Sequence, residues 1–426
     1  MDPNAELWQD CLEYAALSDI GLRRSNNQDS MSVVLASGQN AWEKRGHLFV
    51  VADGMGAHAA GELASRIAVD TIPLIYHKTG HCDPAEALHE AMISANRRIF
   101  ERGEASEDFR GMGTTASSLV ILPEGALVGH CGDSRVYRWR DQQFEQLTFD
   151  HSLVWEMSEA GRIPENEVPD YVPKNIITRS LGPDGDAEID LEGPFPIQAG
   201  DTFLLCSDGL SGPVRDEEMG TLVGCLSPAD AVRSLVDLAN LRGGPDNITV
   251  IIVRVLGPQT AKNDGQVEPK KQPTERSPVH PLLWTFLGAL SLGTIGAVGL
   301  GHLLLAILGL VTTGILATLI MTHRFSTPTP VSEDWAARPL GKGPHRCYPC
   351  KPDAEFVDRL ARTVTQLRDA ATNEDWKIDW QQYNKIHADA DAATFSAQYS
   401  NAVRLYCHAL SFMMGQLRKH SPNEDD

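Results

Sequence analysis

Two hydrophobic patterns alternate over residues 16–255, and turn residues separate them. Short runs rich in Val, Ile, Leu and aromatic residues predict strands over residues 48–52, 118–122, 126–130, 136–139, 202–206 and 248–255. Elsewhere apolar residues recur every three or four positions, which predicts helices over residues 62–76, 84–102 and 228–241. The region therefore mixes helices and strands.

Tight turns join three of the predicted strands. Residues 123–125 (Pro-Glu-Gly) and 132–134 (Gly-Asp-Ser) are typical turn sequences between neighbouring antiparallel strands. Strand pairs joined in this way, with helices grouped between them, favour an α+β fold built as an antiparallel sandwich over a doubly wound sheet. We expect one catalytic domain over residues 1–256.

The pattern changes after this domain. Residues 257–281 are rich in Lys, Gln, Pro, Asn and Asp and predict a flexible linker. Residues 282–322 contain no Asp, Glu, Lys or Arg, and this run exceeds the ~20 apolar residues that cross a bilayer once. It fits a transmembrane hairpin with helices over 282–300 and 303–321. One long tilted span is the alternative.

Basic residues flank the apolar run and none lies within it. They are Lys270, Lys271 and Arg276 before it, and Arg324, Arg338 and Lys342 after it. Because basic residues favour the cytoplasmic side, both flanks are expected there, with the chain in the cell membrane. A buried hairpin of a soluble core is the alternative, but such helices rarely lack polar residues on every face.

A second pair of segments follows the apolar run. Residues 323–351 are Pro-rich and predict a linker, and residues 352–426 predict a small all-α domain that binds a protein partner. Ala402, Tyr406 and Ala409 match the second helix of a tetratricopeptide repeat. An ordinary helical bundle explains the same spacing.

Charge and cysteine content narrow the function. The 426 residues include 57 acidic and 37 basic side chains, a net charge of −20, which argues against a nucleic-acid partner and suits divalent cations. The eight cysteines are spread along the chain and are expected to be reduced thiols. Cys347 and Cys350 are zinc-type ligands without a second ordered pair, so we expect them to be unligated.

Carboxylates follow or precede the predicted strands at several places. They are Asp53, Asp133, Asp208 and Asp246, each with glycine nearby. One such aspartate usually marks only a turn, but hard cations prefer oxygen ligands at rigid, open positions. Upstream, Asp29 adds a carboxylate and Arg24 a guanidinium suited to phosphate oxygens. Together these residues indicate a two-metal phosphoester hydrolase.

The order of these motifs resembles a known family. The segments are SDIGLRRSNNQDS, FVVADGMGAHAAGELAS, GMGTTASSLVI, GHCGDSRVYRWR, LTFDHSLV, ITRSLG, LLCSDGL and GGPDNITVIIV. Over residues 18–255 the chain is similar to the bacterial branch of type 2C metal-dependent serine/threonine protein phosphatases (PPM family). The resemblance implies an αββα sandwich of two antiparallel sheets with a dimetal site at one end.

The resemblance also implies the metal ligands. Asp53 would bridge two Mn²⁺ or Mg²⁺ ions, and the carbonyl of Gly54 would bind one of them. Asp208 and Asp246 would hold the other ion. Asp133, together with Asp208, would help to hold a third, weaker ion.

Other residues carried over from the family surround this site. Asp29 would act through metal-bound water, and Arg24 would grip the substrate phosphate, so that Arg24, Asp29 and Asp53 are the expected catalytic residues. Gln28 stands where the family often has Glu, which predicts weaker binding of one ion. Met55 replaces the His that eukaryotic members use as an acid, and His58 is expected only to pack.

These features predict a membrane-tethered protein phosphatase that hydrolyses phosphoserine and phosphothreonine and opposes serine/threonine kinases. Its flap would lie at residues 158–175. An inactive phosphoprotein-binding scaffold and a dimetal hydrolase of small phosphate esters are the alternatives.

Overall fold

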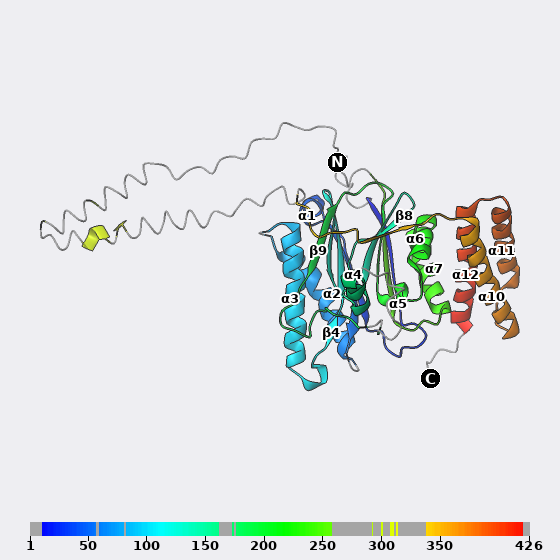
Figure 1. Cartoon of the computed structure of the whole chain (residues 1–426), viewed down its shortest axis with the longest axis horizontal. Coiled ribbons are helices and arrows are strands. Elements are labelled where there is room, and N and C mark those ends of the chain that lie inside the picture. The colour runs from blue at the N-terminus through cyan, green and yellow to red at the C-terminus, as the bar shows by residue number, and fades with distance from the viewer. Residues whose placement is uncertain are drawn as a thin grey trace, which may run out of the picture. The chain divides into compact units, whose positions relative to one another are not determined.

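The computed structural model describes residues 11–56, 59–80, 82–161, 173, 176–257, 292, 300, 307–310, 312–313 and 338–420. The described parts of residues 1–262 and 334–426 belong to one compact unit, and those of residues 263–333 belong to a second. The first unit carries the sheets, the C-terminal helices and all of the predicted site residues (Figure 1).

Two antiparallel sheets form the centre of this unit (Figure 1). The first runs in the order β1 (Leu12–Asp19), β11 (Ile248–Val255), β10 (Thr202–Cys206), β7 (Arg135–Arg140), β8 (Gln143–Gln146) and β12 (Arg346–Pro349). The second runs β2 (Asp29–Val34), β3 (His47–Met55), β5 (Ala116–Leu122), β6 (Gly125–Cys131) and β9 (Asp190–Phe195), with β4 (Gly113–Thr114) paired to β3.

Helices cover the outer face of each sheet. Against the second sheet lie α2 (Ala60–Lys78) and α3 (Pro84–Glu104), and against the first lie α6 (Asp216–Cys225) and α7 (Pro228–Leu241). The shorter helices are α1 (Gln39–Arg45), η1 (Glu107–Phe109), α4 (Leu153–Gly161) and α5 (Asp208–Ser211). The predicted α+β sandwich with flanking helices is therefore confirmed.

The central strands explain why the apolar runs are continuous. In β11, Val250 and Ile252 pack under α6 and α7, whereas Ile251 and Val253 face the opposite sheet. Both faces of such a strand are buried, so polar and apolar residues cannot alternate along it. The six predicted strands all lie within observed strands.

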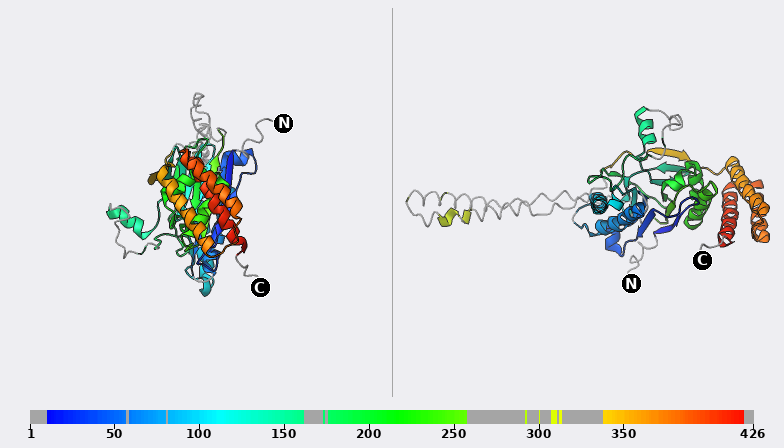
Figure 2. Two further views of the ribbon diagram at one scale, coloured as in Figure 1. Left: turned by 90° about the vertical axis from the view of Figure 1, so that its right-hand side faces the viewer. Right: turned by 90° about the horizontal axis from the view of Figure 1, so that it is seen from below.

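Three further helices extend the layer outside the first sheet. They are α10 (Ala354–Asn373), α11 (Trp380–Phe395) and α12 (Tyr399–His420). Of these, α12 packs against α6 and α7, and α10 and α11 pack against α12 (Figure 1 and Figure 2). Their apolar side chains share one core with the helices below. Arg418 of α12 also donates a hydrogen bond of 2.5 Å to buried Asp237 of α7. These helices thus belong to the same compact unit as the sheets.

The predicted linker over residues 323–351 is wrong at its C-terminal end. Residues 346–349 form β12, which pairs antiparallel with β8 and extends the first sheet. Ahead of it, Leu340 pairs with Gly193 at the end of the other sheet. The short β12 gives no clear signal in the sequence because its partner strand lies some two hundred positions earlier.

The apolar run lies almost wholly outside the described residues. Of residues 282–322, the structure describes 292, 300, 307–310 and 312–313. Within the described parts of the chain, no helix is both long enough and apolar enough to span a bilayer.

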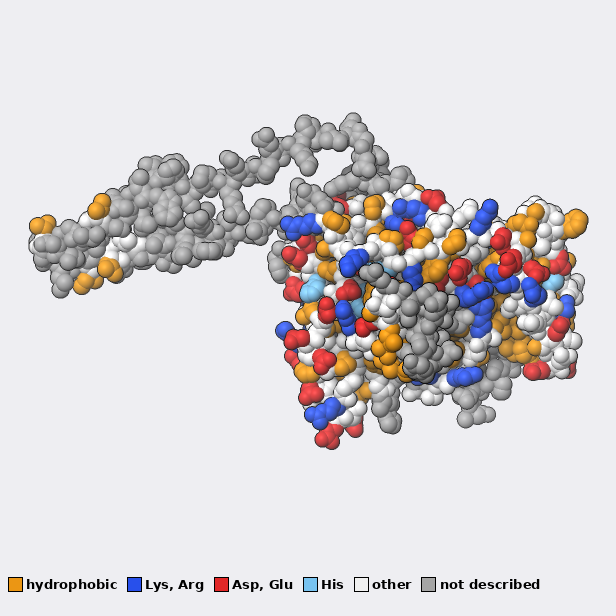
Figure 3. Space-filling view, viewed as in Figure 1, with side chains coloured by type: hydrophobic (Ala, Val, Ile, Leu, Met, Phe, Trp, Pro, Cys, Tyr) orange, Lys and Arg blue, Asp and Glu red, His pale blue; other side chains and the backbone are white. Residues whose placement is uncertain are grey.

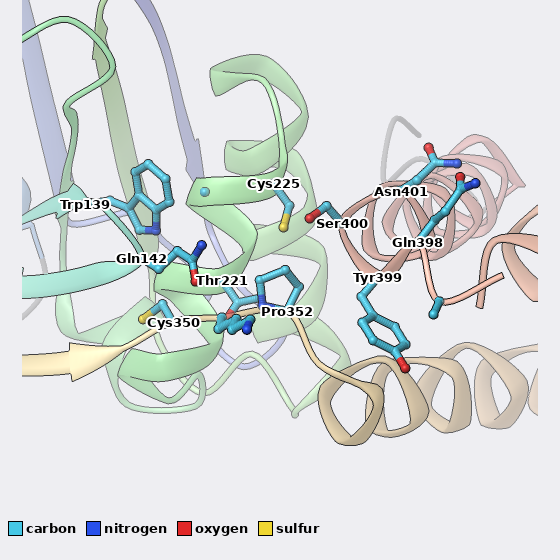
Figure 4. Close-up of a pocket in the computed structure, with 13 residues that line it drawn as sticks. Trp139, Gln142, Thr221, Cys225, Cys350, Pro352, Gln398, Tyr399, Ser400 and Asn401 are labelled. Atoms are coloured by element: carbon cyan, nitrogen blue, oxygen red, sulfur yellow. The ribbon is translucent and has the colours of Figure 1, made fainter. Parts of the chain in front are cut away.

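A pocket of about 530 Å³ opens where the C-terminal helices meet the first sheet (Figure 4). Trp139 and Cys350 line it on the sheet side, and Tyr399, Ser400 and Asn401 line it from the start of α12. The indole nitrogen of Trp139 is buried without a hydrogen-bond partner among the described residues. The helices therefore cover the sheet without filling all of the space beside it.

Candidate active site

Strand ends bring the predicted carboxylates to one end of the sandwich. Asp29 begins β2 directly opposite Asp53 of β3. Asp208 starts α5 just after β10, Asp246 lies just before β11, and Asp133 occupies the turn between β6 and β7. Residues far apart in the sequence thus meet because the ends of these strands adjoin one another.

The backbone around Asp53 is held on both sides. Its N–H donates to Oγ1 of Thr115 at 2.9 Å, and its carbonyl accepts from the Thr115 N–H and the Thr114 hydroxyl, each at 2.8 Å. The Thr115 hydroxyl also shares a hydrogen bond of 2.7 Å with Ser134, next to Asp133. This network couples the position of β3 to that of the turn after β6.

Gly54 is required by close packing. A Cβ atom on Gly54 would lie 2.0 Å from the carbonyl oxygen of Gly61 at the start of α2, so a larger residue would push the helix away. Its N–H donates to the Gln28 carbonyl at 3.1 Å. The predicted role of its own carbonyl as a ligand stays a prediction.

The carboxylates raise one another's pKa. Burial raises the pKa of Asp53 well above its usual value, and the charges of Asp29, Asp208, Asp133 and Asp246 raise it further. Burial likewise raises the pKa of Asp29 to about 7, although hydrogen bonds, including 2.7 Å from the Ser207 hydroxyl, oppose the shift. Such clustered carboxylates cannot all be ionised without a positive charge among them.

Three carboxylate oxygens of the cluster lack the hydrogen-bond partners that would compensate their negative charge. One Oδ1 atom each of Asp29, Asp133 and Asp208 is buried and accepts no hydrogen bond within the described residues. Burial, and then the charge of Asp208, raises the pKa of Asp133 to about 8. Buried polar atoms normally have partners, and a hard cation would supply one. The residues therefore fit divalent metal ions.

This fit does not rest on preformed coordination. The described residues contain no group of three or more His, Cys, Asp or Glu side chains at the spacing of a finished metal centre. The fit rests instead on charge, burial and the missing hydrogen-bond partners.

Arg24 lies at the mouth of the cluster. Its guanidinium donates to Oδ2 of Asp246 at 2.5 Å, and its side chain is 47% exposed. Its charge also lowers the pKa of Asp208, against the larger effect of burial. The structure therefore places the predicted phosphate-binding arginine beside the carboxylates, with one carboxylate as its present partner.

Several supporting residues were not predicted from the sequence. Asn247 accepts from the Gln28 N–H at 2.8 Å and donates to the carbonyls of Ile20 and Asn26, so it ties the Arg24 loop to β11. The Ser207 hydroxyl donates to a carboxylate oxygen of Asp29 at 2.7 Å and so holds that side chain in place. Both residues stand directly beside a predicted ligand, and that adjacency was the only available signal.

Two side chains, one arginine and one histidine, support the turn that carries Asp133, and each of them is paired with a carboxylate. Arg135 binds Asp150 through both carboxylate oxygens, at 2.6–3.0 Å. The Gly132 N–H donates to Nδ1 of His151, whose Nε2 then donates to Asp190 at 2.9 Å. These buried contacts fix the turn and leave Asp133 pointing toward the other carboxylates.

Two predictions near the site lie outside the described residues. They are His58 and, apart from residues 158–161 and 173, the flap at residues 158–175. All eight cysteines lie within the described residues, and no disulfide joins any of them. Cys347 is exposed on β12, and Cys350 is buried against α6.

Comparison with known proteins agrees with this site. Residues 23–240 match the family model described as protein phosphatase 2C. The chain is 39% identical over 248 residues to a putative protein phosphatase 2C-type of Streptococcus pyogenes serotype M6, covering 57% of this chain and 97% of that protein. It is 37% identical to protein phosphatase PhpP of Streptococcus pneumoniae, with the same coverage.

A solved structure extends the comparison to the fold. The Mycobacterium tuberculosis serine/threonine phosphatase PstP/Ppp aligns with a TM-score of 0.51 and 34% identity, covering 58% of this chain and 99% of that chain. The matched family model spans half of the chain and contains Arg24, Asp29, Asp53, Asp133 and Asp208. The chain therefore belongs to the protein phosphatase 2C family and is a protein-serine/threonine phosphatase.

Proposed function

We propose that this phosphatase hydrolyses phosphoserine and phosphothreonine in proteins with a pair of divalent cations, Mn²⁺ or Mg²⁺, held by its carboxylate cluster. The observation that carries the proposal is the set of buried aspartate oxygens without hydrogen-bond partners at one end of the sandwich. Asp53, the Gly54 carbonyl, Asp208 and Asp246 would hold the two cations. Asp133 would help to hold a third, weaker one.

When bound, the cations supply an activated water and neutralise the phosphoryl oxygens. The chain's own residues position the reactants. Ser207 fixes Asp29 by a hydrogen bond of 2.7 Å and leaves its other oxygen free to orient the attacking water. Asp29 and Asp53 face each other across the β2–β3 ladder, which keeps their separation constant.

Arg24 supplies the substrate contact in this proposal. A guanidinium binds two oxygens of one phosphate through parallel N–H donors. Its present contact with Asp246 is on an exposed side chain, so an incoming phosphate can replace it at small cost. The same movement would free an Asp246 oxygen for a cation.

We also propose that residues 282–322 anchor the enzyme in the cell membrane with the catalytic unit in the cytoplasm. The run lacks charged residues and is flanked by basic ones. Residues up to 257 and from 338 belong to one compact unit, tied by the pairing of β12 with β8. A segment that leaves and rejoins one folded body crosses a bilayer an even number of times, which supports a hairpin.

In this setting the enzyme opposes serine/threonine kinases at the membrane surface. The protein partner predicted for the C-terminal helices stays a prediction. Cys347 provides a test of the topology because it is the exposed cysteine of the described C-terminal residues. An impermeant thiol reagent should label it only after the membrane of intact cells is opened. Labelling of intact cells would contradict the hairpin.

The activity is tested on the full chain. Removing the C-terminal helices would expose the apolar surface of α6 and α7. With Mn²⁺ present, we expect turnover of a phosphothreonine peptide far above that of a sugar phosphate. Equal turnover would favour a small-ester hydrolase, and binding without turnover would favour an inactive scaffold.

A further inference from the structure

A second, smaller pocket lies beside the catalytic end, where α10 packs over α6 and α7. Its volume is about 280 Å³. Among the described residues that line it, four are arginines and one is a glutamate: Arg215, Arg242, Arg359, Arg362 and Glu218. In a chain with a net charge of −20, this lining is locally basic. Lys and Arg side chains also gather beside the C-terminal helices in Figure 3.

Glu218 organises the arginines on the phosphatase side of the pocket. It is 6% exposed and accepts from Arg242 at 2.8 and 3.1 Å and from Arg215 at 3.4 Å. One carboxylate thus neutralises only part of two guanidinium groups. Each group keeps further N–H donors that can serve an anion.

The arginines on α10 have weak partners. Arg359 pairs with Glu355 at 2.6 Å and Arg362 with Asp358 at 2.5 Å, and both acidic side chains are exposed, by 79% and 66%. Such exposed pairs one turn apart on a helix contribute little stability. In addition, the Nε atom of Arg359 is buried and has no hydrogen-bond partner among the described residues. One donor of a pocket-lining arginine is therefore left without a hydrogen bond inside the described structure.

The pocket is joined to the catalytic site by a short loop. Arg242 follows α7 directly, and Asp246 lies four positions further on. Between them, the Gly244 carbonyl accepts from the Leu22 N–H at 2.9 Å, two positions before Arg24. The loop that carries Arg24 and the loop that follows Arg242 are therefore direct neighbours.

We propose that this arginine pocket binds the phosphate of a second phosphorylated residue on the same protein substrate. The proposal rests on the proposed phosphoprotein activity and names the substrate class as multiply phosphorylated segments. A phosphate dianion matches several converging guanidinium groups better than a single carboxylate does. Binding there also offsets the repulsion between an acidic enzyme and an acidic substrate.

The test compares two sets of phosphothreonine peptides with the full chain and Mn²⁺. One set carries a second phosphorylated position as a phosphonate that cannot be hydrolysed, at varied distances from the reacting residue, and the other carries serine there. At the best distance we expect the second phosphate to lower KM by about tenfold without raising kcat. Equal KM for both sets at every distance would overturn the proposal.

Variants connect the effect to the pocket. The double change Arg359→Gln and Arg362→Gln should bring the KM ratio of the two peptides close to one. Arg362→Gln alone should bring the ratio part of the way to one. Arg368→Gln is the matched control, because Arg368 lies on the same helix, pairs with neighbouring Asp369 and does not line the pocket. An unchanged ratio in the double variant, or an equal loss in the control, would contradict the assignment.

Direct binding separates this proposal from the proposed activity. Fluorescence anisotropy with the same labelled peptides requires no turnover. If the full chain does not hydrolyse the peptides but binds the doubly modified one more tightly, through Arg359 and Arg362, the activity fails and the pocket stands. Inorganic phosphate, added as a competitor, should weaken binding at both sites, and at saturation it should remove the difference in affinity between the two peptides. No preference in binding would overturn the pocket even if turnover is normal.

Discussion

Buried carboxylates at two places in this protein differ in the number of hydrogen-bond donors around them. At the catalytic end, Asp29, Asp133 and Asp208 each have a buried oxygen without a hydrogen-bond partner in the described structure. Under the C-terminal segment, Glu192 is 4% exposed and accepts from the N–H groups of Lys342 and Gly343 and from His345, at 2.7–2.9 Å. Burial alone does not distinguish them, but the supply of donors does.

The difference separates function from structure. A buried carboxylate with a full set of donors stabilises the contact between two segments, here the second sheet and the residues ahead of β12. A cluster in which several buried oxygens lack donors is tolerated only when another positive group supplies the missing interaction. Variants of the two groups should therefore have opposite consequences.

The largest expected effect is at the catalytic end. Asp208→Asn should lower kcat by roughly 10²–10³-fold, because a cation ligand worth several kcal/mol is lost. The fold should persist, since a neutral amide of the same shape replaces an uncompensated charge. The measurement is kcat on a phosphothreonine peptide at saturating Mn²⁺, with circular dichroism as the control. A near-normal kcat would remove Asp208 from the site.

Glu192→Gln should do the opposite. The amide keeps the shape but loses the charge that accepts three hydrogen bonds, so we expect a loss of about 1–3 kcal/mol in the free energy of unfolding. Denaturant unfolding with Mn²⁺ measures it. The kcat of folded enzyme should stay normal; a large fall in kcat with unchanged stability would erase the contrast between the two groups.

Arg24→Ala should have a smaller effect, confined to substrate binding. Because the guanidinium contacts phosphate in ground state and transition state alike, we expect KM to rise by about tenfold with kcat nearly unchanged. Steady-state kinetics with phosphopeptide measures both constants. If KM does not change, the phosphate binds elsewhere.

The smallest expected effect is a difference in pH dependence. The pKa of Asp29 is raised from 3.8 to about 7, so its contribution to stability is present below pH 3.8 and is lost as the pH rises through about 7. For Glu218, burial raises the pKa, but hydrogen bonds from Arg242 and Arg215 lower it overall, from 4.5 to about 2. Its contribution is present above pH 4.5 and is lost as the pH falls through about 2.

These shifts predict opposite responses in the metal-free protein. With a chelator present, Tm should fall as the pH rises from about 5 to about 8, and Mn²⁺ should reverse that fall. Glu218→Gln should lower Tm at neutral pH and reduce the further loss at acid pH. A metal-free Tm that rises between about pH 5 and pH 8 would contradict the raised pKa of the catalytic carboxylates.

Much of the sandwich could be predicted from the sequence, but not its edges. The strand over residues 248–255 was predicted to the residue because both of its faces are buried and its apolar run is continuous. β1 and β2 were missed, since their sequences LEYAALSD and DSMSVV contain few adjacent β-branched residues. β12 was missed because only its distant partner β8 makes it a strand.

The residues of the candidate site could likewise be predicted only where the local sequence carries a clear signal. Asp53, Asp208 and Asp246 could be predicted because each stands next to a strand with glycine nearby. The structure brings them together, while their roles as ligands remain proposals. The packing of α12 against α7 could not be predicted, because an amphipathic helix shows that it has an apolar face but not what covers that face.

Calorimetric titration of the metal-free full chain with Mn²⁺ tests the central claim most directly, that the carboxylate cluster whose buried oxygens lack donors holds the cations. Buffers of different ionisation enthalpy report the protons released as Mn²⁺ binds. We predict at least two Mn²⁺ per chain with proton release at neutral pH, because the pKa of Asp29 and of Asp133 is raised to about 7 and about 8. Asp208→Asn should lose much of this binding, and Glu192→Gln none. Equal Mn²⁺ binding in wild type and Asp208→Asn would contradict the claim.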